Sequence, residues 1–119
     1  MKYLYRFRYL FFLCSLAILL WGIFRQAPPP ELFKQSDKLL HLIAFCGFAI
    51  ISRFAFMHFN EVIVWLSILA CAPLFEYLQH IFQPSRYFSE QDAVANILGV
   101  VLAWIVWILL MKLKNPRNV

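Results

Sequence analysis

The chain has 119 residues, of which 63% are hydrophobic and only 14% are charged, and its mean hydropathy is +0.71. A soluble domain of this size needs more polar surface to cover its core, so the composition indicates one small integral membrane domain, residues 1–119. The net charge of +5 does not indicate a nucleic-acid partner, because the basic residues flank apolar stretches, where they set topology and contact anionic lipid.

Four apolar segments are predicted to span the membrane, since a transmembrane helix needs about 20 residues. In chain order they cover about residues 9–24, 39–56, 62–81 and 93–111. The predicted fold is therefore an all-α, polytopic bundle of four transmembrane helices. The first span is the shortest, and Phe7 and Arg25 can extend it at the membrane edges.

The first span is predicted to be an uncleaved helix. Its basic start resembles a secretory signal, but residues 22–25 offer no cleavage site with small residues. The prolines Pro28, Pro29 and Pro30 then end the helix, because proline has no amide donor. A further proline, Pro84, is predicted to end the third span.

The start of the fourth span carries two local signals. Ser89 and Asp92 match S-x-x-D, a variant of the capping box that begins helices. Gly99 and Ala103 then continue the face of Asn96 as a seam of small residues, which predicts close packing against a neighbouring helix.

The placement of Lys and Arg favours both termini in the cytoplasm. With the N-terminus inside, the seven inner basic residues are Lys2, Arg6, Arg8, Arg53, Lys112, Lys114 and Arg117. The four outer ones are Arg25, Lys34, Lys38 and Arg86.

Polar residues gather at one end of the second, third and fourth spans. They are Asp37, His41, Glu76, Arg86, Asp92 and Asn96. Ionisable groups at such depth are costly unless they face one another or a water-filled cavity. The alternation of helix direction places all of them at the outer face, which predicts a shared outward-facing pocket.

Structural roles compete with functional ones for several of these residues. Asp37 complements the helix dipole at the start of its span, and it also lies one turn from His41, whose ring it could hold. Glu76, deep in its helix, could form a structural ion pair with Arg86 or Lys38. Arg86 itself is either a phosphate ligand or a snorkelling arginine.

No metal and no cofactor is predicted. His41, Glu76, His80 and Asp92 have suitable ligand chemistry, but the sequence has no H-E-x-x-H motif and no second histidine pair.

Covalent and redox chemistry are not indicated either. Ser85 and Ser89 lack a nucleophile-elbow motif. Cys14, Cys46 and Cys71 are an odd number without a C-x-x-C pair, so they are expected to be small buried hydrophobic residues.

Two stretches, residues 37–45 and 76–99, resemble the signature of the VanZ-like family of small bacterial membrane proteins, a resemblance that covers about residues 37 to 110. The residues at the family's motif positions are Asp37, Lys38, His41, Glu76, Gln79, Pro84, Arg86, Asp92, Asn96 and Gly99. His80 is not part of the pattern. The resemblance implies a bacterial plasma-membrane location and a cell-envelope setting. It supplies no mechanism, and the family's link to glycopeptide-antibiotic resistance does not transfer to this chain by resemblance alone.

Three functions are compatible with this pattern. The leading one is recognition of an anionic lipid or a lipid-linked envelope intermediate, with Arg86 and Lys38 on its phosphate and a proton shared between Glu76 and His41. The second is a hydrolase or transferase that uses Glu76 or His41 as general base. The third is a non-enzymatic interaction protein. A transporter would require an oligomer, because four short helices without an inverted repeat leave little to move.

Overall fold

The structure, a computed structural model, describes residues 2–25, 36–83 and 89–118. These residues form helices and contain no strand: α1 (Lys2–Arg6), α2 (Arg8–Phe24), α3 (Ser36–Ala55), α4 (Glu61–Phe82), α5 (Glu90–Lys114) and the 3-10 turn η1 (Pro116–Asn118). The expectations for Pro28, Pro29, Pro30, Lys34, Pro84, Ser85 and Arg86 concern residues outside these ranges.

Three helices are long and apolar enough to cross a membrane, which indicates a membrane protein. They are α3, α4 and α5, with 20, 22 and 25 residues. α2 has 17 residues, a length of about 26 Å against a hydrocarbon core of about 30 Å. The all-helical prediction is confirmed, and three of its four spans have the required length.

α3 and α5 each begin three residues before their predicted spans, at Ser36 rather than 39 and at Glu90 rather than 93. The first turns of these helices are polar, with Asp37 in one and Asp92 in the other. A prediction based on apolar stretches therefore places the start of each span after these turns.

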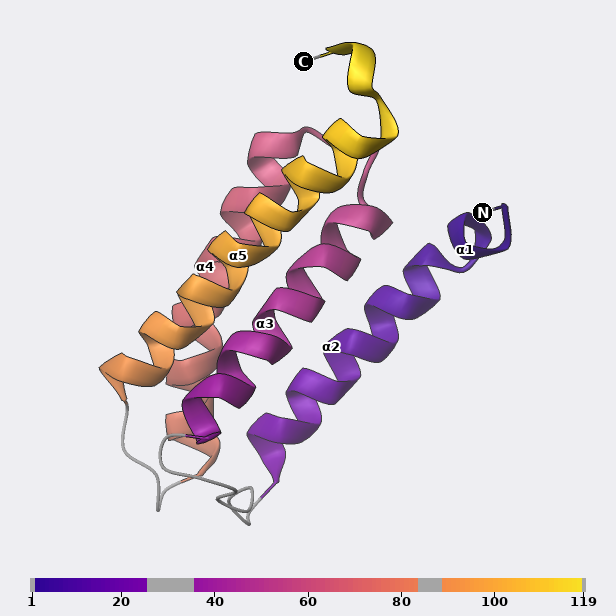
Figure 1. Cartoon of the computed structure of the whole chain (residues 1–119). Helices are drawn as coiled ribbons and strands as arrows, with labels where there is room; N and C mark the ends of the chain where they lie inside the picture. Colours follow the sequence, from indigo (N-terminus) through magenta and orange to yellow (C-terminus); the bar gives the residue numbers. More distant parts are fainter. Residues whose placement is uncertain (1, 26–35, 84–88, 119) are drawn as a thin grey trace.

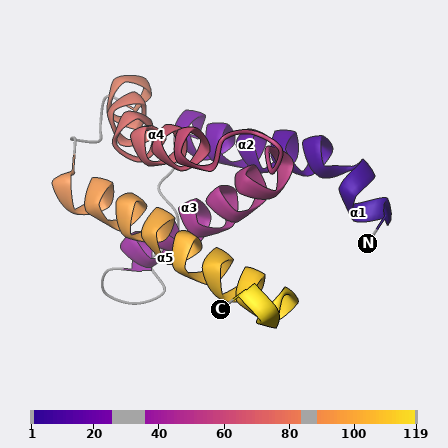
Figure 2. The same cartoon turned by 90° about the horizontal axis from the view of Figure 1, so that it is seen from above.

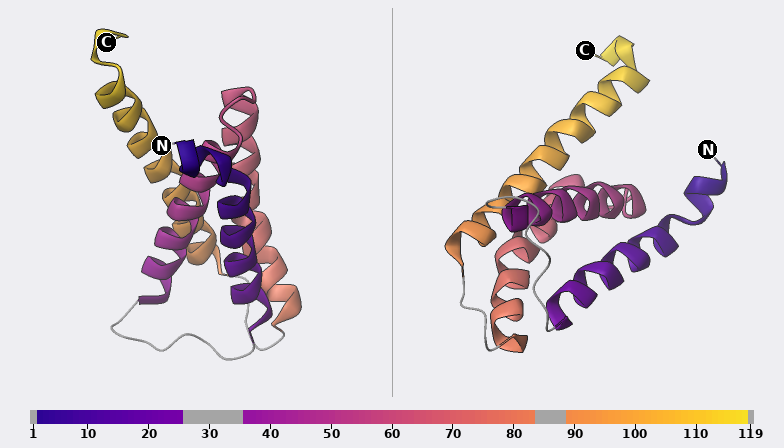
Figure 3. Two further views of the ribbon diagram at one scale, coloured as in Figure 1. Left: turned by 90° about the vertical axis from the view of Figure 1, so that its right-hand side faces the viewer. Right: turned by 60° about the horizontal axis from the view of Figure 1, so that its bottom comes forward.

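The helices form a bundle in which α3 lies between α2 and α5, with α4 behind (Figure 1). α3 and α5 make the most extensive helix pair. Towards its C-terminal end α5 extends away from the other helices (Figures 2 and 3), and its residues 109–114 are exposed. Both ends of the chain lie at one end of the bundle, opposite the starts of α3 and α5 (Figure 1).

The α3–α5 pair is close because Gly99 has no side chain. A Cβ added there would lie 2.5 Å from the Leu42 carbonyl oxygen and 3.1 Å from the Cys46 amide nitrogen. Ala103, one turn further along α5, is fully buried. Of the predicted seam of small residues, Gly99 thus lies on the contact line between α3 and α5, and Ala103 belongs to the apolar core that includes Phe45 and Phe48.

At the end of the bundle that holds the termini, polar side chains join α1 and α2 to the end of α3 and the turn that follows it. The Arg8 Nε donates to the Ala55 carbonyl at 3.2 Å, and the Tyr5 hydroxyl pairs with the His58 ring. Arg53, which the sequence suggested only as a topology-setting charge, is buried and donates to the Phe56 carbonyl at 3.2 Å.

Candidate functional site

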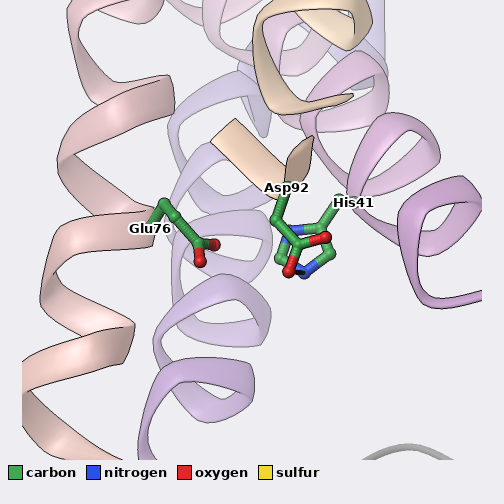
Figure 4. Close-up of side chains that lie close together, drawn as sticks. All are labelled: His41, Glu76 and Asp92. Carbon is green, nitrogen blue, oxygen red and sulfur yellow. Dashed lines mark ion pairs between the residues drawn. The ribbon is translucent and has the colours of Figure 1, made fainter. Parts of the chain in front are cut away.

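Six of the predicted site residues meet at the opposite end of the bundle. This polar cluster comprises Asp37, Lys38, His41, Glu76, Asp92 and Asn96, from the start of α3, the last third of α4 and the start of α5. Glu76, Asp92 and Asn96 are 1%, 3% and 1% exposed. Figure 4 shows the carboxylates of Glu76 and Asp92 near the His41 ring. The gathering of polar helix ends predicted from the sequence is therefore present.

The ion pairs in the polar cluster centre on Lys38. Its Nζ lies 3.5 Å from Asp92 Oδ1 and 3.6 Å from Asp37 Oδ2. The ion pair suggested between Lys38 and Glu76 is replaced by the pair with Asp92, because α5 brings Asp92 to α3. The other suggested partner of Glu76, Arg86, lies outside the described residues.

His41 is held by Asn96, and not by Asp37 as its spacing suggested. The His41 Nδ1 lies 2.9 Å from Asn96 Oδ1, and the Asn96 Nδ2 donates to the Ala72 carbonyl at 3.1 Å. Because the Asn96 amide nitrogen is turned to Ala72, its oxygen accepts, so the His41 Nδ1 carries the hydrogen. The other ring nitrogen, Nε2, faces Asp92 Oδ2 at 3.8 Å.

The capping box of α5 is divided between two helices. Ser89 Oγ accepts from the Asp92 amide at 3.2 Å, which confirms the predicted N-cap. The reciprocal bond comes from α4, since the Ser89 amide donates to Glu76 Oε1 at 3.2 Å. In a capping box the acid at Asp92's position would make that bond. With Glu76 in this role, the Asp92 carboxylate faces Lys38 and His41.

A cavity of about 280 Å³ adjoins the polar cluster. The cavity lining and the polar cluster share three residues, Asp37, His41 and Asn96. The apolar part of the lining comes mainly from α2, α3 and α4: Ile18, Leu19, Trp21, Gly22, Leu40, Ala44, Phe45 and Phe75. Gln79, a predicted site residue, lies on this lining rather than among the bonded residues of the cluster.

Two residues that sequence reasoning did not assign to the site complete its α2 side. Arg25, which the sequence suggested only as a topology-setting charge and an extension of the first span, lines the cavity. Gln83 is buried after the end of α4, and its Nε2 donates to the Gly22 and Arg25 carbonyls. A polar residue directly after the last apolar turn of a predicted span was the available signal for Gln83.

The metal-ligating groups are fewer than the sequence suggested. Three residues each offer one ligand atom, and these atoms lie within 4.8 Å of one another: His41, Glu76 and Asp92. His80 does not belong to this group. The proposed proton sharing between Glu76 and His41 and a base role for either residue stay predictions, since the hydrogen bonds described here join His41 to Asn96 and Glu76 to Ser89.

No protein-family model, curated protein or solved structure matches this chain in comparison with known proteins. The resemblance to the VanZ-like family therefore stays an expectation carried by the residues quoted for it.

Proposed function

We propose that this chain is a multi-pass protein of the bacterial plasma membrane that recognises an anionic, phosphate-bearing lipid or lipid-linked envelope intermediate. In this proposal α2 crosses the membrane in addition to α3, α4 and α5, both termini are cytoplasmic and the polar cluster faces outward.

The observation that carries the proposal is the joining of an apolar cavity to a buried polar cluster. Leu19, Leu40 and Phe75 offer an apolar wall, and His41 and Asn96 offer a polar end. An amphiphile satisfies both surfaces at once. Since small-molecule pockets measure about 300–1,000 Å³, a cavity of about 280 Å³ suits one segment of a lipid, such as the start of a chain beside its headgroup.

Basic residues at this end support an anionic headgroup. Arg25 lines the cavity, and its guanidinium lies over the Trp21 ring at 5.1 Å. Lys38 is in the adjoining cluster, and Arg86 belongs to the same end by sequence. Guanidinium groups bind phosphate through paired hydrogen bonds, which is the role proposed for Arg25 and Arg86.

Two glycines provide a matched test of the cavity. A Cβ added at Gly22 or at Gly47 meets no atom within 4 Å, but only Gly22 lines the cavity. Gly22→Leu should fill the cavity and weaken binding of short-chain phosphatidylglycerol at least about tenfold, whereas Gly47→Leu should bind like the wild type. Tryptophan fluorescence can follow the titration because Trp21 is on the lining, with short-chain phosphatidylcholine as the zwitterionic comparison.

Mass spectrometry of lipid that copurifies in mild detergent would identify the natural ligand. Equal binding by the two glycine variants, or no preference for the anionic lipid, would contradict the proposal.

A further inference from the structure

We propose that His41, Glu76 and Asp92 form a binding site for a first-row divalent cation of the Zn²⁺ or Mn²⁺ type. The ligand atoms are His41 Nε2, one carboxylate oxygen of Glu76 and Asp92 Oδ2. Cation binding does not depend on the proposed lipid. A second step, in which the cation contacts the phosphate of the lipid, does rest on the proposed function.

The three side chains come from three helices and lie close together (Figure 4). One ring nitrogen of His41 and one carboxylate oxygen each of Glu76 and Asp92 lie within 4.8 Å of one another. Two atoms bound to one tetrahedral Zn²⁺ at about 2.0–2.2 Å are about 3.3–3.6 Å apart. Small side-chain movements therefore bring the three atoms onto one ion.

The His41 ring is held as in many metal sites. Metal-binding histidines usually donate their other N–H to an oxygen that holds the ring in place. Asn96 Oδ1 accepts from the His41 Nδ1 in this way, and the Ala72 carbonyl holds the Asn96 amide in turn. Nε2 then faces Asp92 Oδ2 at 3.8 Å, beyond the 3.2 Å of an ordinary hydrogen bond. A cation between these atoms would be bound by both.

The donor set also suits a divalent cation. One imidazole nitrogen and two carboxylate oxygens are ligands that Zn²⁺ binds in proteins. Lys38 lies at Asp92 Oδ1 and leaves Oδ2 directed at His41.

The cation would also make an acidic cluster compatible with an anionic ligand. Three protein ligands leave coordination positions for water or a phosphate oxygen. His41 and Asn96 both line the cavity, so a headgroup bound there would lie beside the cation.

The test begins with wild-type protein carrying a Strep-tag rather than a His-tag, stripped with chelator in mild detergent and titrated with Co²⁺ and Mn²⁺. We expect about one ion per chain, with a visible Co²⁺ spectrum that lacks a sulfur charge-transfer band from the free cysteines. His41→Gln and Asp92→Asn should each lower affinity at least about 100-fold. Asn96→Ala, which removes the support of the ring but leaves the three ligands in place, should lower it about 10–100-fold.

His58→Gln and Glu61→Gln are the matched controls, because both residues are exposed at the opposite end of the bundle. They should bind Co²⁺ like the wild type. Circular dichroism and gel filtration show which variants fold, and the wild-type titration needs no variant at all. Absence of stoichiometric Co²⁺ and Mn²⁺ binding by folded wild type, or binding that survives His41→Gln and Asp92→Asn, would overturn the inference.

Lipid measurements separate this inference from the proposed function. Gly22→Leu should bind Co²⁺ normally while it loses phosphatidylglycerol. Cation binding without lipid binding by the wild type would support the cation site and contradict the proposed function. Lipid binding by folded wild type that takes up no cation would overturn the cation site and support the proposed function.

Discussion

At the scale of single residues, Glu76 shows how a buried carboxylate can serve a helix to which it does not belong. It is 1% exposed on α4 and accepts from the Ser89 amide, at the start of α5. The first amides of a helix have no partner within the helix, so this bond gives a partner to the part-buried amide at the start of α5. The same bond fixes the end of α4 against the start of α5.

Glu76→Ala and Glu76→Gln separate this capping bond from the charge of the side chain. Both substitutions remove the carboxylate, but only glutamine keeps an oxygen that can accept from the Ser89 amide. In chelator, we expect Glu76→Ala to have a free energy of unfolding about 1 kcal/mol or more below that of Glu76→Gln. Titration with SDS in mixed micelles measures the difference, and equal stability of the two variants would exclude a capping role.

At the scale of helices, the α3–α5 pair positions the cluster. Gly99 allows the two backbones to approach, and Asn96 lies one turn before it on α5, where its side chain reaches His41 on α3. Membrane helices associate closely where small residues line the interface, because lipid offers no hydrophobic force between them. The spacing of α3 and α5 therefore determines whether His41 and Asn96 can meet.

Gly99→Ala tests this spacing, with Gly47→Ala as its control. The added methyl group at Gly99 would lie 2.5 Å from the Leu42 carbonyl oxygen, a backbone atom that cannot rotate away. The helices must separate, at a cost of about 1–3 kcal/mol in the free energy of unfolding. At Gly47 there is free space, so alanine should leave stability unchanged or raise it by up to about 1 kcal/mol. Similar effects at both glycines would show that the contact line does not limit the approach.

At the scale of the whole molecule, both chain ends lie at one end of the bundle and the starts of α3 and α5 lie at the other (Figure 1). The polar cluster is at these helix starts. This arrangement follows if α2 crosses the membrane together with α3, α4 and α5. The 17 residues of α2 are few for a span, and Arg8 and Arg25 at its ends can reach the headgroup level.

Cysteine labelling in intact cells distinguishes four spans from three. In a variant whose three cysteines are replaced by serine, a cysteine at Glu90 should react with a membrane-impermeant maleimide. Cysteines at Lys2 and at Asn115 should react only after the membrane is made permeable. If α2 does not cross, position 2 will instead be labelled together with position 90. Labelling of position 115 in intact cells would reverse the predicted orientation.

Hydropathy and helix-end signals alone predict much of this molecule. The apolar segments predict the helices, Ser89 predicts the start of α5, and Gly99 and Ala103 predict a close contact. The meeting of Asp37, Glu76 and Asp92 at one end also follows from sequence, because consecutive helices run in opposite directions. These features depend on residues close together in the chain or on helix direction, and both can be read along the sequence.

The pairings within the site were decided only by the tertiary structure. Asn96 rather than Asp37 holds His41, and Asp92 rather than Glu76 pairs with Lys38. Gly22 of α2 and Arg25, directly after it, line the cavity. Each of these contacts joins different helices, so it depends on how far each helix is rotated about its axis and on where the helices cross. Hydropathy patterns determine which segments are buried in the membrane, but side-chain packing such as that at Gly99 determines which residues face one another.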